Sequence, residues 1–131
     1  MIDYPNIVGV LGWVSTMVFW ILIVVSMKVI YNNIVPFKGY KCINIFGFLF
    51  VRKGCVMSEI DLNHERIHTA QMKEMLYVFF YLWYFVEWLV ELAHYKGKAY
   101  RTNTFEREAY SNESDLTYLL KRTLFAWLKY L

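Results

Sequence analysis

Cysteine is scarce in this sequence, and no C-x-x-C pair occurs in it. The two cysteines are Cys42 and Cys55. Two cysteines cannot build a disulfide framework, and zinc sites made of paired cysteines are excluded. We therefore expect two free thiols. The alternative is a bridge across a hairpin, which would require a turn at residues 48 and 49.

Charge is also low. Charged residues make up 19% of the chain, against about 25% in typical soluble domains. The 14 basic and 11 acidic residues leave a net charge of +3, and the basic residues are scattered. This distribution gives no nucleic-acid-binding surface. Hydrophobic residues reach 58%, above the usual range of about 45–50%, which indicates contact with lipid.

Two long apolar runs account for much of this hydrophobicity. Residues 7–31 carry one charge, Lys28, and are long enough to cross ~30 Å of hydrocarbon. The run is too long for a signal peptide, and an acid, Asp3, precedes it instead of basic residues. We predict a transmembrane helix over 7–31. Residues 77–95 predict a second apolar membrane helix, although this run contains Glu87, Glu91 and His94.

The remaining segments are shorter. Residues 42–51 are rich in β-branched and aromatic side chains, which favours a β-hairpin or edge strand; a loop dipping into the membrane is the alternative. Glycine and proline are absent from 55 to 96, so helix is expected there, starting near Ser58. The basic, aromatic residues 117–131 suit an amphipathic helix at the membrane surface. We thus predict one mainly α membrane-embedded domain over 1–131.

The motif H-E-x-x-H lies within the expected helix, as His64, Glu65 and His68. Residues four apart share one helix face, so both histidines can bind one metal ion. Glu65 lies on the adjacent face, where it can accept a proton from a zinc-activated water. This pattern is typical of zinc metalloproteases.

A catalytic zinc usually has three protein ligands, so a third is needed. Glu74 would lie about 9 Å further along a continuous helix, which makes it a poor candidate. The polar residues of the second apolar run are a second choice. Glu106 and Glu108, within the sequence FEREAY, are better placed at the start of a further helix.

H-E-x-x-H followed by E-x-x-A resembles the gluzincin zinc metallopeptidases. The likeness covers roughly residues 60–112 and is closest to integral-membrane members: the CAAX prenyl protease/heat-shock protease X type and the β-lactam sensor-transducer type. A group of small bacterial membrane proteins is also similar. The resemblance implies that Glu106 is the third zinc ligand and that Glu108 is the fallback. It departs at Tyr110, where the family usually has an Asp that orients a histidine.

A length argument limits how Glu106 reaches the histidines. A straight helix from His68 to Tyr95 would span ~40 Å, whereas residues 96–105 reach at most ~34 Å. Either the helix breaks between about Gln71 and Phe80, or Glu106 comes from a second protomer in a homodimer. Basic residues follow both apolar runs, which predicts a site near the cytoplasmic face of the membrane. The resemblance implies that this is a bacterial inner membrane.

These features predict a membrane zinc metallopeptidase, with Zn2+ bound by His64, His68 and Glu106 in the region 58–112. Its substrate would be a peptide or membrane protein, paired in extended form with the strand in 42–51, which gluzincins place beside the zinc helix. One alternative is a non-proteolytic membrane zinc sensor or regulatory protein. Another is a zinc hydrolase acting on lipids or other amides. Tyr100, Arg101 or Tyr110 would stabilise the oxyanion. Asn63 and Gln71 would hydrogen-bond to the zinc ligands.

Overall fold

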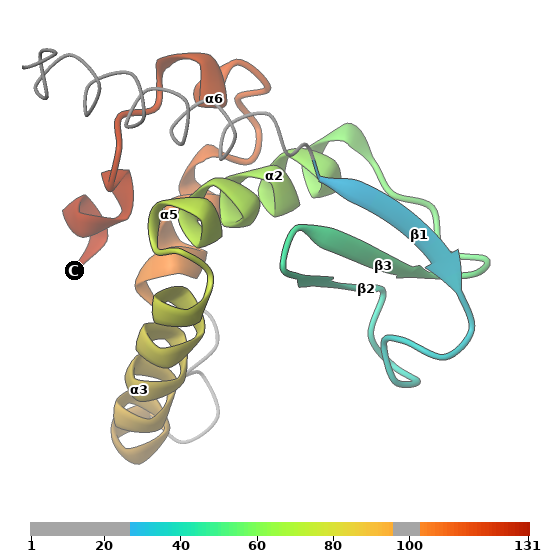
Figure 1. Cartoon of the computed structure of the whole chain (residues 1–131), viewed down its shortest axis with the longest axis horizontal. Coiled ribbons are helices and arrows are strands. Elements are labelled where there is room, and N and C mark those ends of the chain that lie inside the picture. Colours follow the sequence, from blue (N-terminus) through green and yellow to red (C-terminus); the bar gives the residue numbers. More distant parts are fainter. Residues whose placement is uncertain (1–26, 96–102) are drawn as a thin grey trace, which may run out of the picture.

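The computed structural model describes residues 27–95 and 103–131 of the chain (Figure 1). A three-stranded sheet comes first, formed by β1 (Lys28–Asn32), β2 (Cys42–Ile45) and β3 (Phe48–Arg52). The strand order is β1-β3-β2, with β3 parallel to β1 and antiparallel to β2. The strand predicted in 42–51 is therefore a hairpin, and β2 is an edge strand.

The hairpin turn consists of Phe46 and Gly47, because Ile45 pairs with Phe48. Both turn residues have positive φ, 51° and 81°, as a tight two-residue hairpin requires. The turn does not lie at residues 48 and 49, where a bridge between the cysteines would need it. Both cysteines are free thiols, as predicted.

Helix α2 (Glu59–Glu74) carries the H-E-x-x-H motif. It begins with a capping box: the Ser58 hydroxyl accepts from the Asp61 amide at 3.1 Å, and the Asp61 carboxylate accepts from the Ser58 amide at 2.8 Å. Lys41 pairs with the same carboxylate at 2.6 Å. The start of α2 is thus fixed both by its own cap and by the loop before β2.

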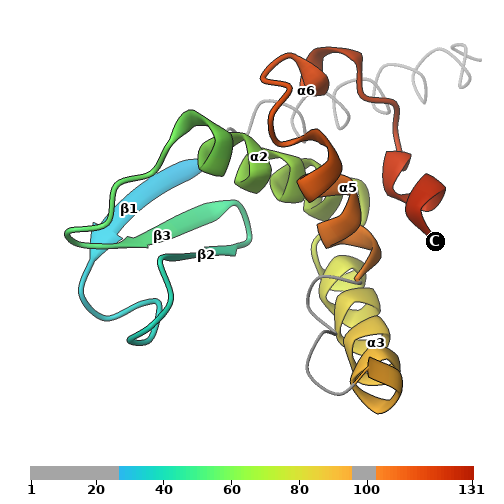
Figure 2. The same cartoon turned by 180° about the vertical axis from the view of Figure 1, so that it is seen from behind.

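The chain turns sharply between α2 and α3 (Val78–Tyr95), which meet at a bend of 111°. Leu76 and Tyr77 make the turn in the left-handed region, with φ of 50° and 60°. This break lies within the interval 71–80 that the length argument predicted. In Figures 1 and 2, α3 extends from the end of α2 away from the sheet.

The chain then returns to α2 through α5 (Thr104–Asn112), followed by α6 (Tyr118–Lys121) and a 3-10 helix, η1 (Ala126–Tyr130). Helix α2 lies between the edge strand β2 and helix α5, and η1 packs on α5. The core where these elements meet consists of Met72, Phe80, Phe105 and Trp127. This packing places the first turn of α5 against the histidine face of α2.

The predicted mainly α membrane fold is wrong for the part of the chain that the structure describes. That part combines a mixed sheet with four α-helices, and none of these helices alone has the length and hydropathy to cross a membrane. Glutamates, tyrosines and tryptophans lower the hydropathy of α3. Only α2 and α3 taken together, as the bent pair Glu59–Glu74 and Val78–Ala93, meet those criteria.

Two further expectations need correction. Of the predicted transmembrane helix 7–31, residues 7–26 lie outside the described residues, and 28–31 belong to strand β1. The predicted C-terminal amphipathic helix is divided into α6 and η1. The division follows from Phe125, which has a φ of 54°, and from Trp127, which turns into the core with 5% exposure.

Candidate metal centre

The two histidines of the motif lie one turn apart on α2 and point the same way. Their Nε2 atoms are 3.0 Å apart, and both side chains are buried. The i, i+4 spacing creates this pair, and the packing of α5 on the same face removes it from solvent. The pair places two imidazole nitrogens at one point.

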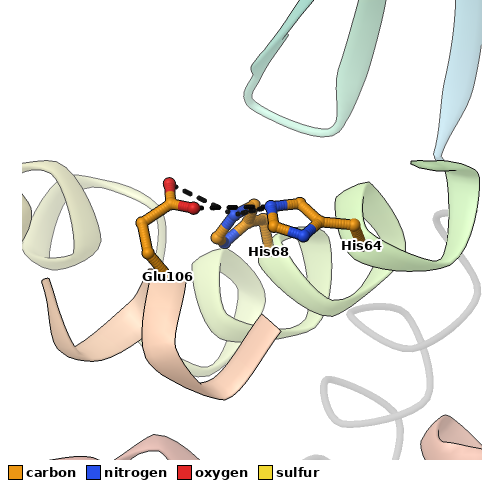
Figure 3. A group of neighbouring side chains, drawn as sticks. All are labelled: His64, His68 and Glu106. Atoms are coloured by element: carbon orange, nitrogen blue, oxygen red, sulfur yellow. Dashed lines mark hydrogen bonds and ion pairs between the residues drawn. The ribbon is translucent and has the colours of Figure 1, made fainter. Parts of the chain in front are cut away.

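Glu106 completes a three-residue group from the first turn of α5 (Figure 3). Its Oε2 lies 3.4 Å from His64 Nε2, and its Oε1 lies 3.4 Å from His68 Nε2. One donor atom from each of the three residues lies within 4.8 Å of the other two. The buried group His64, His68 and Glu106 could hold a metal ion.

Glu106 fits a cation for a second reason. The residue is 2% exposed, and its Oε2 makes no hydrogen bond. A buried carboxylate oxygen without a hydrogen bond is costly unless a positive charge faces it. A bound cation between the three donors would supply that charge.

The other nitrogen of each histidine has its own partner. His64 Nδ1 lies 2.8 Å from Glu113 Oε2, and His68 Nδ1 lies 2.8 Å from Gln71 Oε1. Both partners are acceptors, so each imidazole keeps its proton on Nδ1 and leaves Nε2 for a metal. Such outer hydrogen bonds are typical of metal-binding histidines.

The sequence did not reveal Glu113 as a partner of His64. The resemblance places an orienting acid at position 110, where this chain has Tyr110, whose ring packs edge-on against His64 at 4.8 Å between centroids. Glu113 instead follows the last turn of α5 and reaches the same histidine. Its spacing of seven residues, two helical turns, from Glu106 is the signal that could have identified it.

The charges in the group are strongly coupled. Burial by itself lowers the pKa of His68, but Glu106, Glu65 and Gln71 together outweigh burial and raise that pKa to about 9. Burial alone would raise the pKa of Glu106, yet His68 and His64 hold it well below its ordinary value. Without metal, a proton on His68 therefore takes the place of the cation beside Glu106.

Both ends of α5 are fixed by side chains from other helices. Glu87 of α3 accepts hydrogen bonds from the amide (3.0 Å) and hydroxyl of Thr104 at the first residue of α5. Asn63 of α2 donates to the carbonyls of Glu113 and Asp115 beyond its last turn, at 2.9 and 3.0 Å. Asn63 therefore hydrogen-bonds to the end of α5, not to one of the three donor side chains as predicted. Glu87 positions the start of α5 and does not belong to the group of possible metal ligands.

Glu65 faces the edge strand β2. Its Oε1 lies 3.6 Å from Cys42 Sγ, and its charge is close enough to contribute to the raised pKa of His68. Burial first and then Glu65 raise the pKa of the Cys42 thiol to about 12, so this cysteine remains a thiol. Asn44, also on β2, donates to the Glu65 carbonyl at 2.9 Å and fixes strand to helix.

The other candidate ligands have different partners. Among the described residues, Glu108 pairs with Arg122 at 2.6 Å and not with Arg107, and Glu74 pairs with the same Arg122. Neither carboxylate belongs to the three-residue group. Of the remaining candidates, Glu91 is also outside the group, the side chain of His94 is not described, and Tyr100 and Arg101 lie outside the described residues.

Comparison of the chain with protein-family models, curated proteins and solved structures finds no match. The resemblance to gluzincins therefore depends on the two sequence motifs alone.

Proposed function

We propose that the protein is a zinc metallopeptidase in which Glu65 is the general base. The observation that carries the proposal is the convergence of His64, His68 and Glu106, with Glu65 on the neighbouring face of the same helix. Two imidazole nitrogens and one carboxylate, with a further position open, are the usual ligands of a catalytic zinc ion.

The ion, when bound, would polarise a peptide carbonyl and lower the pKa of a water molecule. Glu65 accepts a proton from the attacking water and then donates it to the amine nitrogen as the C–N bond breaks. The Nδ1 hydrogen bonds to Glu113 and Gln71 keep both imidazoles oriented throughout.

The position of strand β2 favours a peptide as the substrate. It is the sheet edge nearest α2, since Asn44 bonds to the Glu65 carbonyl and, at 3.0 Å, to the Thr69 hydroxyl. An extended peptide added along this edge would run beside Glu65. Main-chain pairing of this kind makes few demands on the substrate's side chains, so we expect broad sequence tolerance.

The test compares the purified protein with Glu65→Gln, measuring zinc content and cleavage of a peptide panel. Glu65→Gln should keep its zinc and lose at least about 100-fold in cleavage rate, because only the base is removed. Glu59→Gln, which removes an exposed carboxylate of the same helix, serves as the matched control and should cleave normally. Equal cleavage by Glu65→Gln and the unchanged protein would refute the role of Glu65.

A non-proteolytic zinc sensor or regulatory protein is the second candidate. The observation that favours it is the burial of all three donor residues, which are at most 8% exposed. Structural zinc sites are closed, whereas catalytic sites keep one position accessible. Stoichiometric zinc with no cleavage of any peptide, in the presence of lipid or detergent, would support this reading.

We also propose that the protein is attached to a membrane, with its site near the cytoplasmic face. Support comes from the apolar residues 7–26 and from large apolar side chains exposed on α3, including Phe79, Leu82, Phe85 and Val86. Fractionation of bacterial cells expressing the chain should recover it in membranes after an alkaline carbonate wash. Recovery in the supernatant before the wash would contradict attachment.

A further inference from the structure

A buried charge cluster lies behind His68, on the side away from Glu106. It consists of Glu108, Arg122 and Glu74, with side chains 0%, 4% and 7% exposed. Arg122 Nε donates to Glu108 Oε1 at 2.6 Å, and its Nη2 donates to Glu74 Oε2 at 3.2 Å. Tyr118 donates to Glu108 Oε1 at 2.9 Å. Burying three charges is expensive and needs a reason beyond stability.

The cluster is connected to His68 through Gln71, which is fully buried. Gln71 Nε2 donates to Glu108 Oε2 at 2.9 Å and to the Phe105 carbonyl at 3.1 Å. Gln71 Oε1 faces His68 Nδ1 at 2.8 Å. The chain of contacts thus runs from Arg122 through Glu108 and Gln71 to a histidine of the metal centre.

The donor and acceptor types of these groups fix the direction of each hydrogen bond between Glu108 and His68. An amide nitrogen can only donate, and an amide oxygen can only accept. Two acceptors, Glu108 Oε2 and the Phe105 carbonyl, meet one end of Gln71, so the nitrogen must occupy that end. The oxygen then faces His68, and His68 Nδ1 must carry the proton.

We propose that Glu108, held by Arg122, is a positioning residue that sets the tautomer of His68 through the amide of Gln71. When the extra proton beside Glu106 is absent, the lone pair of His68 is thereby kept on Nε2, facing Glu106 and His64. This inference rests on the metal centre of the proposed function. It gives Glu108 a task other than that of a metal ligand.

Glu108→Gln tests the direction of the hydrogen bonds with almost no change in shape. Arg122 Nε and Tyr118 both donate at the Oε1 position, so the amide introduced at position 108 would place its oxygen there and its nitrogen toward Gln71. Gln71 would then have to rotate to present its oxygen, which breaks its hydrogen bond to the Phe105 carbonyl. The Gln71 nitrogen would face His68 Nδ1 and demand the other tautomer. We expect zinc affinity to fall by about 10- to 100-fold, as for other outer-shell changes.

The exchange variant Gln71→Glu/Glu108→Gln should reverse this loss. Its carboxylate at position 71 accepts from His68 Nδ1 and from the new amide at position 108, so the direction at His68 is restored, while the Phe105 carbonyl loses its donor. A purely structural role for the Glu108–Arg122 ion pair predicts no rescue, because Arg122 still faces a neutral amide. Recovery of affinity to within about threefold of the unchanged protein supports positioning.

The measurements are Zn2+ affinity, by competition with a chromophoric chelator, and long-range 1H–15N spectra of the Zn2+-loaded full chain labelled in histidine. The unchanged protein and the exchange variant should show His68 protonated at Nδ1 and bound through Nε2. A Glu108→Gln protein with unchanged affinity and the same Nδ1 proton would overturn the proposal. Absence of Zn2+ binding by the unchanged protein would overturn it together with the metal centre.

If Glu108→Gln does not fold, Gln71→Met tests whether the contact with Gln71 sets the tautomer of His68. It removes the partner of His68 Nδ1 but leaves Glu108 with Arg122 and Tyr118, so it should fold and bind zinc about 10-fold less tightly. Unchanged affinity and tautomer in Gln71→Met would overturn the proposal. These readouts do not involve cleavage, so a protein with this tautomer but no peptidase activity would refute only the proposed reaction.

Discussion

Individual side chains outside the three donors decide whether the donors point at one place. Glu113 is such a residue, since its carboxylate holds His64 Nδ1 at 2.8 Å from a side chain 27% exposed. Without it, the imidazole could rotate and expose the wrong nitrogen to Glu106. The metal centre therefore depends on residues at the end of α5 as well as at its start.

Glu113→Ala should lower zinc affinity by about 10-fold, because the His64 ring loses the acceptor that orients it. Chelator competition measures the change, and Glu59→Ala is the control because Glu59 is exposed on α2 and pairs with Arg66. If the two variants bind zinc equally, Glu113 does not orient His64.

Asp61 should make the stability of the folded protein depend on pH in the acid range. Lys41 and Ser58 lower its pKa to about 2, below the unfolded value of about 3.9. A lowered pKa contributes stability above pH ~4 that is lost as the pH falls through 2. Asp61→Asn should therefore show a shallower decline of melting temperature between pH 4 and pH 2. An identical decline in both proteins would rule out this contribution.

At the scale of elements, the bend between α2 and α3 does most to build the site, because it sends the chain back with Glu106. Leu76 is 57% exposed and has a φ of 50°, so its side chain contributes strain and little packing. A left-handed conformation costs a non-glycine residue ~1–2 kcal/mol. The packing of neighbouring core residues such as Met72 and Phe80 compensates for this strain.

Leu76→Gly should leave stability unchanged or raise it by up to about 1 kcal/mol, since relief of strain is offset by the ~0.5–1 kcal/mol entropic cost of glycine. The matched control is Arg66→Gly at an exposed position within α2, which should lose about 1 kcal/mol. Urea unfolding of both variants gives the comparison. Equal losses would mean that the turn is not strained at Leu76.

The sequence predicted most elements near the site and failed elsewhere for identifiable reasons. The Ser58 cap and the lack of glycine and proline predicted α2, and chain length predicted its break. The exact turn was not predictable, because Leu76 and Tyr77 adopt a conformation that their side chains disfavour. The C-terminal helix was wrong because burial of Trp127 overrides the helical pattern around it.

At the scale of the whole molecule, the donors come from two helices, α2 and α5, which α3 separates in the sequence. A cation bound by His64, His68 and Glu106 would therefore tie α2 to α5 and stabilise the folded chain. A ligand at roughly 100 times its dissociation constant contributes about 2.7 kcal/mol. The fold and the proposed metal centre should thus be thermodynamically linked.

Saturating Zn2+ should raise the melting temperature of the metal-free protein by on the order of 10 °C. His68→Ala removes one donor and should abolish most of this shift. Differential scanning calorimetry with and without a chelator provides the measurement. A shift of equal size in His68→Ala would place the stabilising zinc at another site.

The candidate site was predictable only in part. His64, Glu65 and His68 follow from helical spacing, and the choice of Glu106 came from a resemblance between motifs. Glu113, Gln71 and the buried Glu108–Arg122 pair became apparent only from packing, because their partners are distant in sequence. Hydrogen-bond direction, on which the tautomer of His68 depends, has no signature in a single sequence.

The sharp turn after α2 also sets an order of events during biosynthesis. A growing chain that ends before α5 offers an ion only the two imidazoles of α2, which bind it weakly and exchange it readily. Stable capture must wait until α3 is complete and Glu106 has come back beside them. An ion bound by the three residues would therefore enter an almost finished fold, where it would compete with a proton on His68.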